Sequence, residues 1–228
     1  MAVQPNTKGY GLGGKRVVIT QANSFMGPHL VEAFTKEGAD VIPDQRDLTH
    51  DKAADNLVCE VKDIDVLVIN LATDRFRANA LELTDLQFHQ PFEEMVYPLF
   101  RLGRSVLPQM IARRSGKIIV MGSAAPLRAF PNASAYASAR GAQLAWVKAV
   151  GVEVAPHNVQ VNAIGFFSGL VSEYQVAKWN IESLSGRDDC RILSLKYSVS
   201  LMPLARLRII PILMLPASIL ALVSLCFA

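Results

Sequence analysis

The chain has 228 residues, 51% of them hydrophobic, so it can bury one sizeable core, and its length favours one domain over two. Its formal net charge is +3, but the charged residues after Asp189 are all basic, and residues 1–190 carry 19 basic against 20 acidic side chains. A nearly neutral body lacks the basic surface that nucleic acid requires, so nucleic acid is excluded as a partner.

The cysteines and histidines indicate whether disulfides or a metal site are expected, and the N-terminal sequence indicates the cellular compartment. Cys59, Cys190 and Cys226 are widely separated and form no CxxC pair, which argues against a disulfide framework and a zinc site. The four histidines share no spacing, so no metal site is expected. No apolar segment precedes the first polar and glycine residues, so no secretory signal is predicted and the expected location is cytoplasmic.

Short apolar runs alternate with helical patterns along the first 165 residues. The strand-like runs lie at 15–20, 41–42, 64–70, 117–122 and 159–164. Helices are expected from about residue 30 to Gly38, from Phe92 to Arg113 with kinks near Pro98 and Pro108, and from Ser134 to Ala155. Continuous β-branched strands alternating with helices predict a doubly wound, Rossmann-like α/β fold, a parallel sheet with helices on both faces.

The character of the sequence changes after Ser168. Residues 1–168 are therefore interpreted as the Rossmann-like catalytic core and residues 169–228 as an atypical C-terminal segment. Residues 209–228 contain no charged side chain and have the length of a membrane span, with Arg206 and Arg208 just before them. A membrane segment, a buried helix and a non-native sequence, for instance after a frame change, all remain open for this tail.

The stretch from Ser123 to Arg140 carries the chemistry of the core. Ser123 follows the strand-like run 117–122 and would lie at its C-terminal end, the edge of an α/β sheet where ligands bind. Tyr136 and Arg140 are four residues apart, so on a helix they share one face. A hydroxyl, a phenol and a guanidinium can therefore converge at this edge.

The spacing of Ser123, Tyr136 and Arg140 resembles the short-chain dehydrogenase/reductase superfamily, whose pattern is Ser followed by Tyr-x-x-x-Lys. Asn70 and the segment 161–164 also fit family motifs, and the resemblance covers about residues 15–167. It implies the Rossmann-like fold. In that family a final strand closes the sheet after a Gly-Gly segment, and this sequence contains no such segment, so the final strand is expected to be missing.

Two departures distinguish the chain within this superfamily. The dehydrogenases carry Thr-Gly-x-x-x-Gly-x-Gly after the first strand, but here Gln21 and Phe25 replace the first two glycines and only Gly27 remains. Arg140 also stands where they carry Lys. In both departures the chain resembles the halohydrin dehalogenases, which are marked by Thr-x-x-x-x-(Phe/Tyr)-x-Gly and a Ser-Tyr-Arg triad.

This second resemblance implies a carbon–halide lyase that converts a vicinal haloalcohol to an epoxide without redox chemistry and without a cofactor. Tyr136 would be the general base, activated by the permanent charge of Arg140, and Ser123 would bind the substrate hydroxyl. The reverse reaction would open epoxides with anions such as azide, cyanide or nitrite. The implied partners are a small halohydrin or epoxide and a halide, and the implied assembly is a homotetramer.

The resemblance also implies a halide pocket in the place of the nicotinamide. Its wall would be Phe25, and the loop after the sixth strand would add Phe166 and the backbone amides of Ser168 and Gly169. Two rival functions stay open. One is an NAD(P)-dependent reductase with a degenerate glycine loop, and the other is an inactive product with an altered C-terminus.

Asp44 and Met95 bear on whether the chain binds a nicotinamide cofactor. Asp44 ends the second strand, where an acid could bind a ribose hydroxyl, but without the glycines it is interpreted as a solvated loop residue. Met95 falls near the helix position where the dehydrogenases place an asparagine that supports a proton relay. Its apolar side chain cannot take that role, and an ordinary core residue is the alternative.

Overall fold

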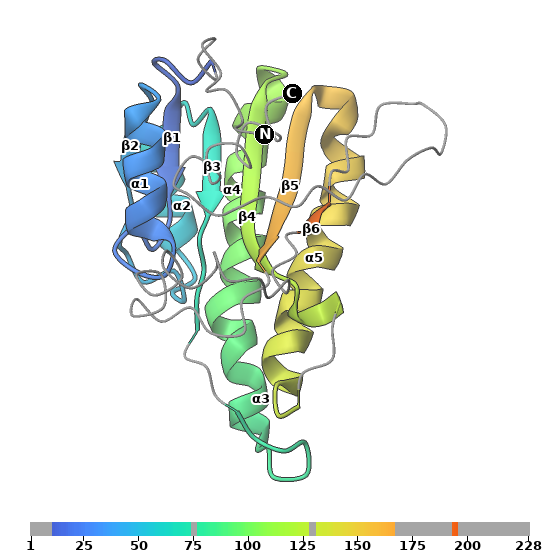
Figure 1. Ribbon diagram of the computed structural model, residues 1–228. Helices are drawn as coiled ribbons and strands as arrows, with labels where there is room; N and C mark the ends of the chain where they lie inside the picture. Colours follow the sequence, from blue (N-terminus) through green and yellow to red (C-terminus); the bar gives the residue numbers. More distant parts are fainter. Residues whose placement is uncertain (1–10, 74–76, 128–130, 167–192, 196–228) are drawn as a thin grey trace, which may run out of the picture.

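A computed structural model describes residues 11–73, 77–127, 131–166 and 193–195 (Figure 1). The strands are β1 (Arg16–Ile19), β2 (Asp40–Pro43), β3 (Val66–Ile69), β4 (Gly116–Ser123), β5 (Val159–Phe166) and β6 (Leu193–Leu195). They form one sheet in the order β2-β1-β3-β4-β5-β6. The first five strands pair in parallel and the three-residue β6 runs antiparallel to β5, so the predicted Rossmann-like sheet is confirmed.

Helices cover both faces of this sheet. They are α1 (Gly27–Lys36), α2 (Ala53–Val61), α3 (Asp85–Pro91), the π-helix η1 (Phe92–Val96), α4 (Tyr97–Ala112), the 3₁₀ turns η2 (Ala125–Leu127) and η3 (Ala155–His157), and α5 (Ser134–Val154). Among the described residues, no helix is long and apolar enough to cross a membrane. The predicted boundary at residue 168 and the uncharged tail 209–228 lie outside the described residues.

Alternation along the strands divides the core into two layers. Val17 and Ile19 of β1 pack with Phe34 of α1 in one apolar cluster. Val18, between them, belongs to a second cluster together with Leu99 of α4. Successive strand residues point to opposite faces, so both faces of a buried strand must be apolar and both must be covered by helices.

The helical region before β4 begins earlier than predicted and is irregular. Thr84 and Gln87 form a capping box, with Thr84 Oγ1 accepting from the Gln87 amide at 3.3 Å and Gln87 Oε1 accepting from the Thr84 amide at 2.9 Å. This cap starts α3 at Asp85. The expected kink near Pro98 takes the form of η1, in which the Tyr97 amide donates to the Phe92 carbonyl five residues back.

The strand order reverses beside β1, which places the ends of β1 and β3 next to each other. Thr20, directly after β1, is fully buried, and its Oγ1 donates to the Asn70 carbonyl at 3.2 Å and accepts from the Asn70 amide at 2.9 Å. One hydroxyl therefore satisfies both backbone groups of the residue that follows β3. In an open α/β sheet this reversal point is where a ligand crevice forms.

Replacing Thr20 with Val should test this connection. The variant keeps the shape but leaves a buried N–H and a buried C=O of Asn70 without partners, so we expect the free energy of unfolding to fall by about 2 kcal/mol. Urea denaturation followed by circular dichroism measures the change. Thr49→Val is the matched control, because the exposed Thr49 hydroxyl donates only to Asp47, and it should change stability by less than about 0.5 kcal/mol. Equal losses in the two variants would contradict the assignment.

Candidate functional site

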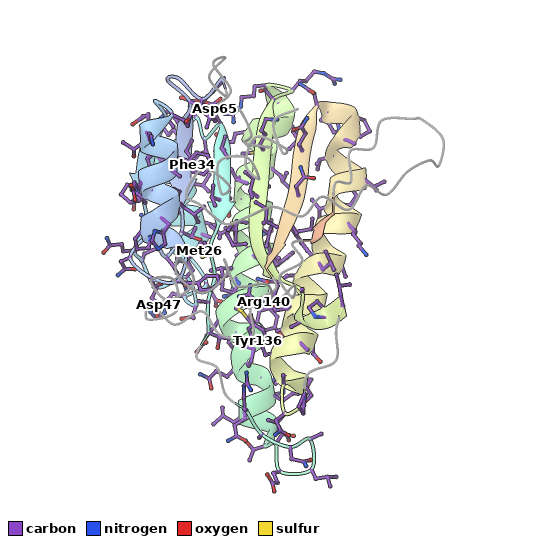
Figure 2. The ribbon with its side chains drawn as sticks, viewed as in Figure 1. Met26, Phe34, Asp47, Asp65, Tyr136 and Arg140 are labelled. Atoms are coloured by element: carbon purple, nitrogen blue, oxygen red, sulfur yellow. The ribbon has the colours of Figure 1, made fainter. Side chains whose placement is uncertain are left out.

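One face of α5 carries three polar side chains toward the sheet. Tyr136, Arg140 and Gln143 occupy positions i, i+4 and i+7 of this alanine-rich helix, so they stack along a single face. Arg140 is 3% exposed and Gln143 2% exposed, whereas Tyr136 is partly buried. Figure 2 shows Tyr136 and Arg140 next to each other near the C-terminal ends of the strands. The predicted pairing of phenol and guanidinium is present.

The guanidinium of Arg140 is held by four neutral acceptors. Its Nε donates to the Tyr136 hydroxyl at 3.1 Å, and Nη1 donates to the Met121 carbonyl and to Gln143 Oε1, both at 2.9 Å. Nη2 donates to the Leu71 carbonyl at 3.1 Å. Within the described residues no carboxylate pairs with this buried cation. Hydrogen bonds to dipoles therefore stabilise this cation, and the Tyr136 hydroxyl is the one acceptor among them that carries an acidic proton.

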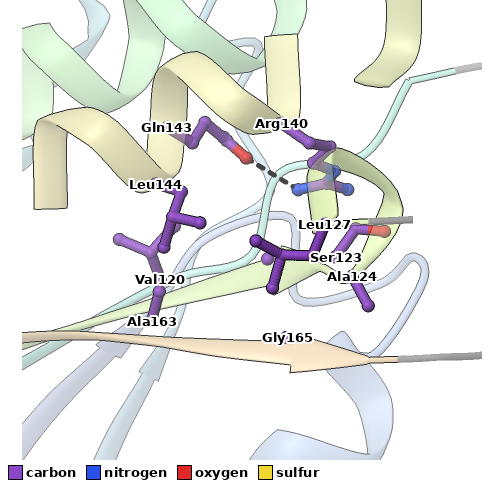
Figure 3. Close-up of a pocket in the computed structure, with 10 residues that line it drawn as sticks. Val120, Ser123, Ala124, Leu127, Arg140, Gln143, Leu144, Ala163 and Gly165 are labelled. Carbon is purple, nitrogen blue, oxygen red and sulfur yellow. Dashed lines mark hydrogen bonds between the residues drawn. The ribbon is translucent and has the colours of Figure 1, made fainter. Parts of the chain in front are cut away.

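Ser123 ends β4 beside the same guanidinium. Its Oγ accepts from the Ala125 amide at 3.1 Å, which fixes the hydroxyl at the start of η2. Ser123 and Arg140 line one pocket between β4, β5 and α5 (Figure 3), together with Val120, Gly122, Ala124, Leu127, Gln143, Leu144, Ala163 and Gly165. The three residues predicted from the Ser-Tyr-Arg spacing are therefore gathered at the C-terminal edge of β4.

The turn between β1 and α1 keeps a glycine-like backbone without the glycines. Gln21 and Phe25 have φ angles of 44° and 53°, in the left-handed region that glycine adopts most easily. Gly27 cannot be replaced, because a Cβ there would lie 2.4 Å from the Gln21 carbonyl oxygen. Only one of three positions thus requires glycine for space, and the other two place side chains where the dehydrogenases have none.

Asn70 and Gln21 close this turn over the ends of β1 and β3. The side-chain amide of Asn70 donates to the Gln21 carbonyl at 3.0 Å and to the Ser24 carbonyl at 3.1 Å. Gln21 Oε1 in turn accepts from the Ala72 amide at 2.8 Å. The Gln21 side chain therefore bridges the two loops that meet at the reversal of strand order.

The turn between β1 and α1 does not fit the pyrophosphate of the dinucleotide that the superfamily implies. A pyrophosphate needs backbone amides that it can approach closely, and glycines make that approach possible. Here the Gln21 side chain occupies the Ala72 amide, and Phe25, 37% exposed, stands at a loop position that otherwise carries glycine. We therefore derive no chemistry from a nicotinamide cofactor.

Of the four residues expected to form the halide pocket, the structure describes Phe25 and the backbone of Phe166. Phe25 lies on the β1–α1 turn, and Phe166 is the last residue of β5, where its Cα pairs with that of Ser123. Ser168 and Gly169 lie outside the described residues. The halide pocket thus stays a prediction. In the described part of the chain, no cluster of three or more histidine, cysteine or acidic side chains could hold a metal ion.

The interpretation of Asp44 as a solvated loop residue was wrong. Asp44 is 6% exposed, and its Oδ1 pairs with Nε of Arg46 at 2.6 Å while Oδ2 has no hydrogen-bond partner. Burial raises the pKa of Asp44, and the hydrogen bond from Arg46 opposes that rise. The following Arg46 explains the error, since a cation two residues away can accompany a carboxylate into a buried position.

Sequence reasoning missed two further site residues. Gln143 accepts a hydrogen bond from Arg140, and Gln21 links the turn between β1 and α1 to Ala72. The signal for Gln143 was its place seven residues after Tyr136, because a polar side chain there shares the face that carries the phenol and the guanidinium. For Gln21 only the lost glycine was visible, and its partner Ala72 lies 51 residues away.

Curated relatives with similar sequences are mainly named as reductases or dehydrogenases. L-xylulose reductase of Mesocricetus auratus is 29% identical over 175 residues, which cover 68% of this chain and 71% of that protein. The 2-(R)-hydroxypropyl-CoM dehydrogenase of Xanthobacter autotrophicus is 35% identical over 127 residues, 55% of this chain and half of its own length. These names favour the reductase reading over the dehalogenase reading.

One solved structure is described as a dehalogenation enzyme. It is 27% identical, covers 68% of this chain and 72% of its own, and superposes with a TM-score of 0.59. The family model described as "short chain dehydrogenase" matches residues 7–172, which include the sheet through β5 and all three residues of the predicted triad. This chain therefore belongs to the short-chain dehydrogenase family.

Proposed function

We propose that this member of the family is a cofactor-independent halohydrin dehalogenase, a carbon–halide lyase. The observation that carries the proposal is the buried Arg140, whose hydrogen-bond acceptors among the described residues are all neutral and include the Tyr136 hydroxyl at 3.1 Å. The turn between β1 and α1 supports it, because Gln21 and Phe25 stand there in place of glycines. The solved structure described as a dehalogenation enzyme is in keeping with it.

The proposed reaction needs a base and a positioned alcohol. Ser123 would bind the hydroxyl of a vicinal halohydrin and present its proton to Tyr136. As Tyr136 takes the proton, the oxygen attacks the adjacent carbon from behind, so that a C–O bond forms and the carbon–halogen bond breaks. The halide leaves with the bonding electron pair, and the product is an epoxide. Holding both reacting groups in one molecule lowers much of the barrier.

The departing halide would be received by the pocket assigned to Phe25, Phe166, Ser168 and Gly169. Aromatic walls and backbone amides suit a weakly hydrated anion, because they combine low polarity with a few donors. The same pocket would accept azide, cyanide or nitrite when the enzyme opens epoxides. A homotetramer is the assembly that this proposal implies.

The second candidate is an NAD(P)-dependent reductase. The names of the curated relatives favour it, and the buried Asp44 at the end of β2 has an unpartnered Oδ2 that a ribose hydroxyl could meet. The third candidate, an inactive product with an altered C-terminus, depends on residues 169–228, of which the structure describes only 193–195.

Halide release should separate the first candidate from the other two. We expect the purified full chain to release halide from 1,3-dichloro-2-propanol in buffer without nicotinamide, as measured by a colorimetric chloride assay. Tyr136→Phe should lower the rate by about 10²–10⁴-fold, since it removes the base. Tyr97→Phe, at a tyrosine of α4 that is 42% exposed, is the control and should leave the rate unchanged. NADPH oxidation with carbonyl substrates, without halide release, would refute the proposal in favour of the reductase.

Restoring the glycines should test whether Gln21 and Phe25 prevent a nicotinamide cofactor from binding at the turn between β1 and α1. In Gln21→Gly/Phe25→Gly the relief of backbone strain at two positive φ angles offsets the loss of the Gln21–Ala72 hydrogen bond, so the variant should still fold. We expect isothermal titration calorimetry to detect NADH or NADPH binding to this variant, and none to the native chain at millimolar cofactor. Ser24→Gly, in the same turn, is the control and should not bind. Saturable binding by the native chain would contradict the proposed blockage.

A further inference from the structure

We propose that Gln143 is a positioning residue that holds Arg140 against Tyr136, and that the π-helix η1 in turn orients Gln143. The proposal rests on the proposed role of Tyr136 as the base. It assigns a role to a side chain outside the Ser-Tyr-Arg triad and to an irregular helical segment. The residues involved lie on α5 and η1, which pack against each other.

The hydrogen bonds of Gln143 form a directed chain. Its Oε1 accepts from Arg140 Nη1 at 2.9 Å, and its Nε2 donates to the Met95 carbonyl at 2.9 Å. Met95 is fully buried within η1. The chain thus runs from the backbone of η1 through the amide to the guanidinium, and from the guanidinium to the Tyr136 hydroxyl.

The Met95 carbonyl decides which end of the amide faces Arg140. A carbonyl oxygen can only accept, so it requires the NH₂ end of Gln143. A flipped amide would place its NH₂ group against the guanidinium N–H and its oxygen against the Met95 carbonyl, and both contacts would be repulsive. The backbone of η1 therefore fixes Gln143 in the orientation that offers an acceptor to Arg140.

This arrangement holds the cation without neutralising it. A carboxylate in the place of Gln143 would pair with Arg140 and weaken the field that favours an ionised Tyr136. A neutral amide accepts the same hydrogen bond but leaves the positive charge to the phenol. Met95, near the position where the dehydrogenases place a relay asparagine, thus contributes its main-chain carbonyl.

Other charged groups near this face are few and stay constant in the test. On the elements packed against α5, the charged or titratable residues are Asp85 and His89 of α3, Glu93 and Glu94 of η1, Tyr97, Arg101 and Arg104 of α4, Lys117 of β4 and His157 of η3. All of them are exposed or partly buried. None is changed by substituting Gln143, so a shift in the ionisation of Tyr136 would report on Gln143.

The test is the ionisation of Tyr136 in Gln143→Met and Gln143→Leu, which fill the space but make neither hydrogen bond. Ultraviolet difference titration measures the phenolate, and subtracting the same titration in a Tyr136→Phe background isolates Tyr136. We expect its midpoint to move up by about one pH unit, and kcat/KM for halide release at neutral pH to fall about tenfold. Two variants are used so that one that fails to fold does not decide the result.

Gln109→Met is the matched control. Gln109 Oε1 accepts from the Ile64 amide at 3.0 Å, far from the site, so its loss should lower stability without moving the titration. An unchanged Tyr136 midpoint in a folded Gln143 variant would overturn the proposal, as would an equal shift in Gln109→Met. If the titration moves as expected but the native chain releases no halide, the positioning role stands and the dehalogenase proposal alone fails.

Discussion

A buried guanidinium that meets no carboxylate among the residues the structure describes is the constraint on which the candidate site depends. Moving a cation out of water is costly, and the described part of the chain compensates Arg140 with dipoles, from Met121, Leu71, Gln143 and the phenol of Tyr136. Of these acceptors, only the phenol can become negative. The hydrogen bond between this cation and the phenol is therefore what connects the packing of α5 with the acid–base chemistry proposed for Tyr136.

The fold, and the shared helix face of Tyr136 and Arg140, could be predicted from the sequence because both follow local rules. Strand-length apolar runs between helical patterns define a parallel sheet, and the four-residue interval between Tyr136 and Arg140 defines a shared helix face. The capping box at Thr84 and Gln87 was also visible and would have placed the start of α3 correctly. Helix α2 was missed although its residues form an ordinary helix.

The remaining features depend on partners that are distant in sequence. Gln21 meets Ala72, and Gln143 meets the Met95 carbonyl, 48 residues away. Burial of Asp44 follows from the packing of β2 and from Arg46 rather than from its own chemistry. Residue spacing along one helix cannot reveal such contacts, since the sheet topology must first bring the segments together.

The anchoring of Arg140 to main-chain carbonyls has a consequence for how such an enzyme could be altered. Leu71 and Met121 contribute backbone oxygens from the ends of β3 and β4, and Met95 contributes one from η1. Substituting those side chains would leave the oxygens in place as long as the sheet and η1 persist. The guanidinium is thus registered to the backbone of the scaffold, whereas the side chains of Leu127, Leu144 and Ala163 in the same pocket take no part in holding it. The shape of the pocket could therefore be redesigned at these positions without displacing the cation that the proposed base depends on.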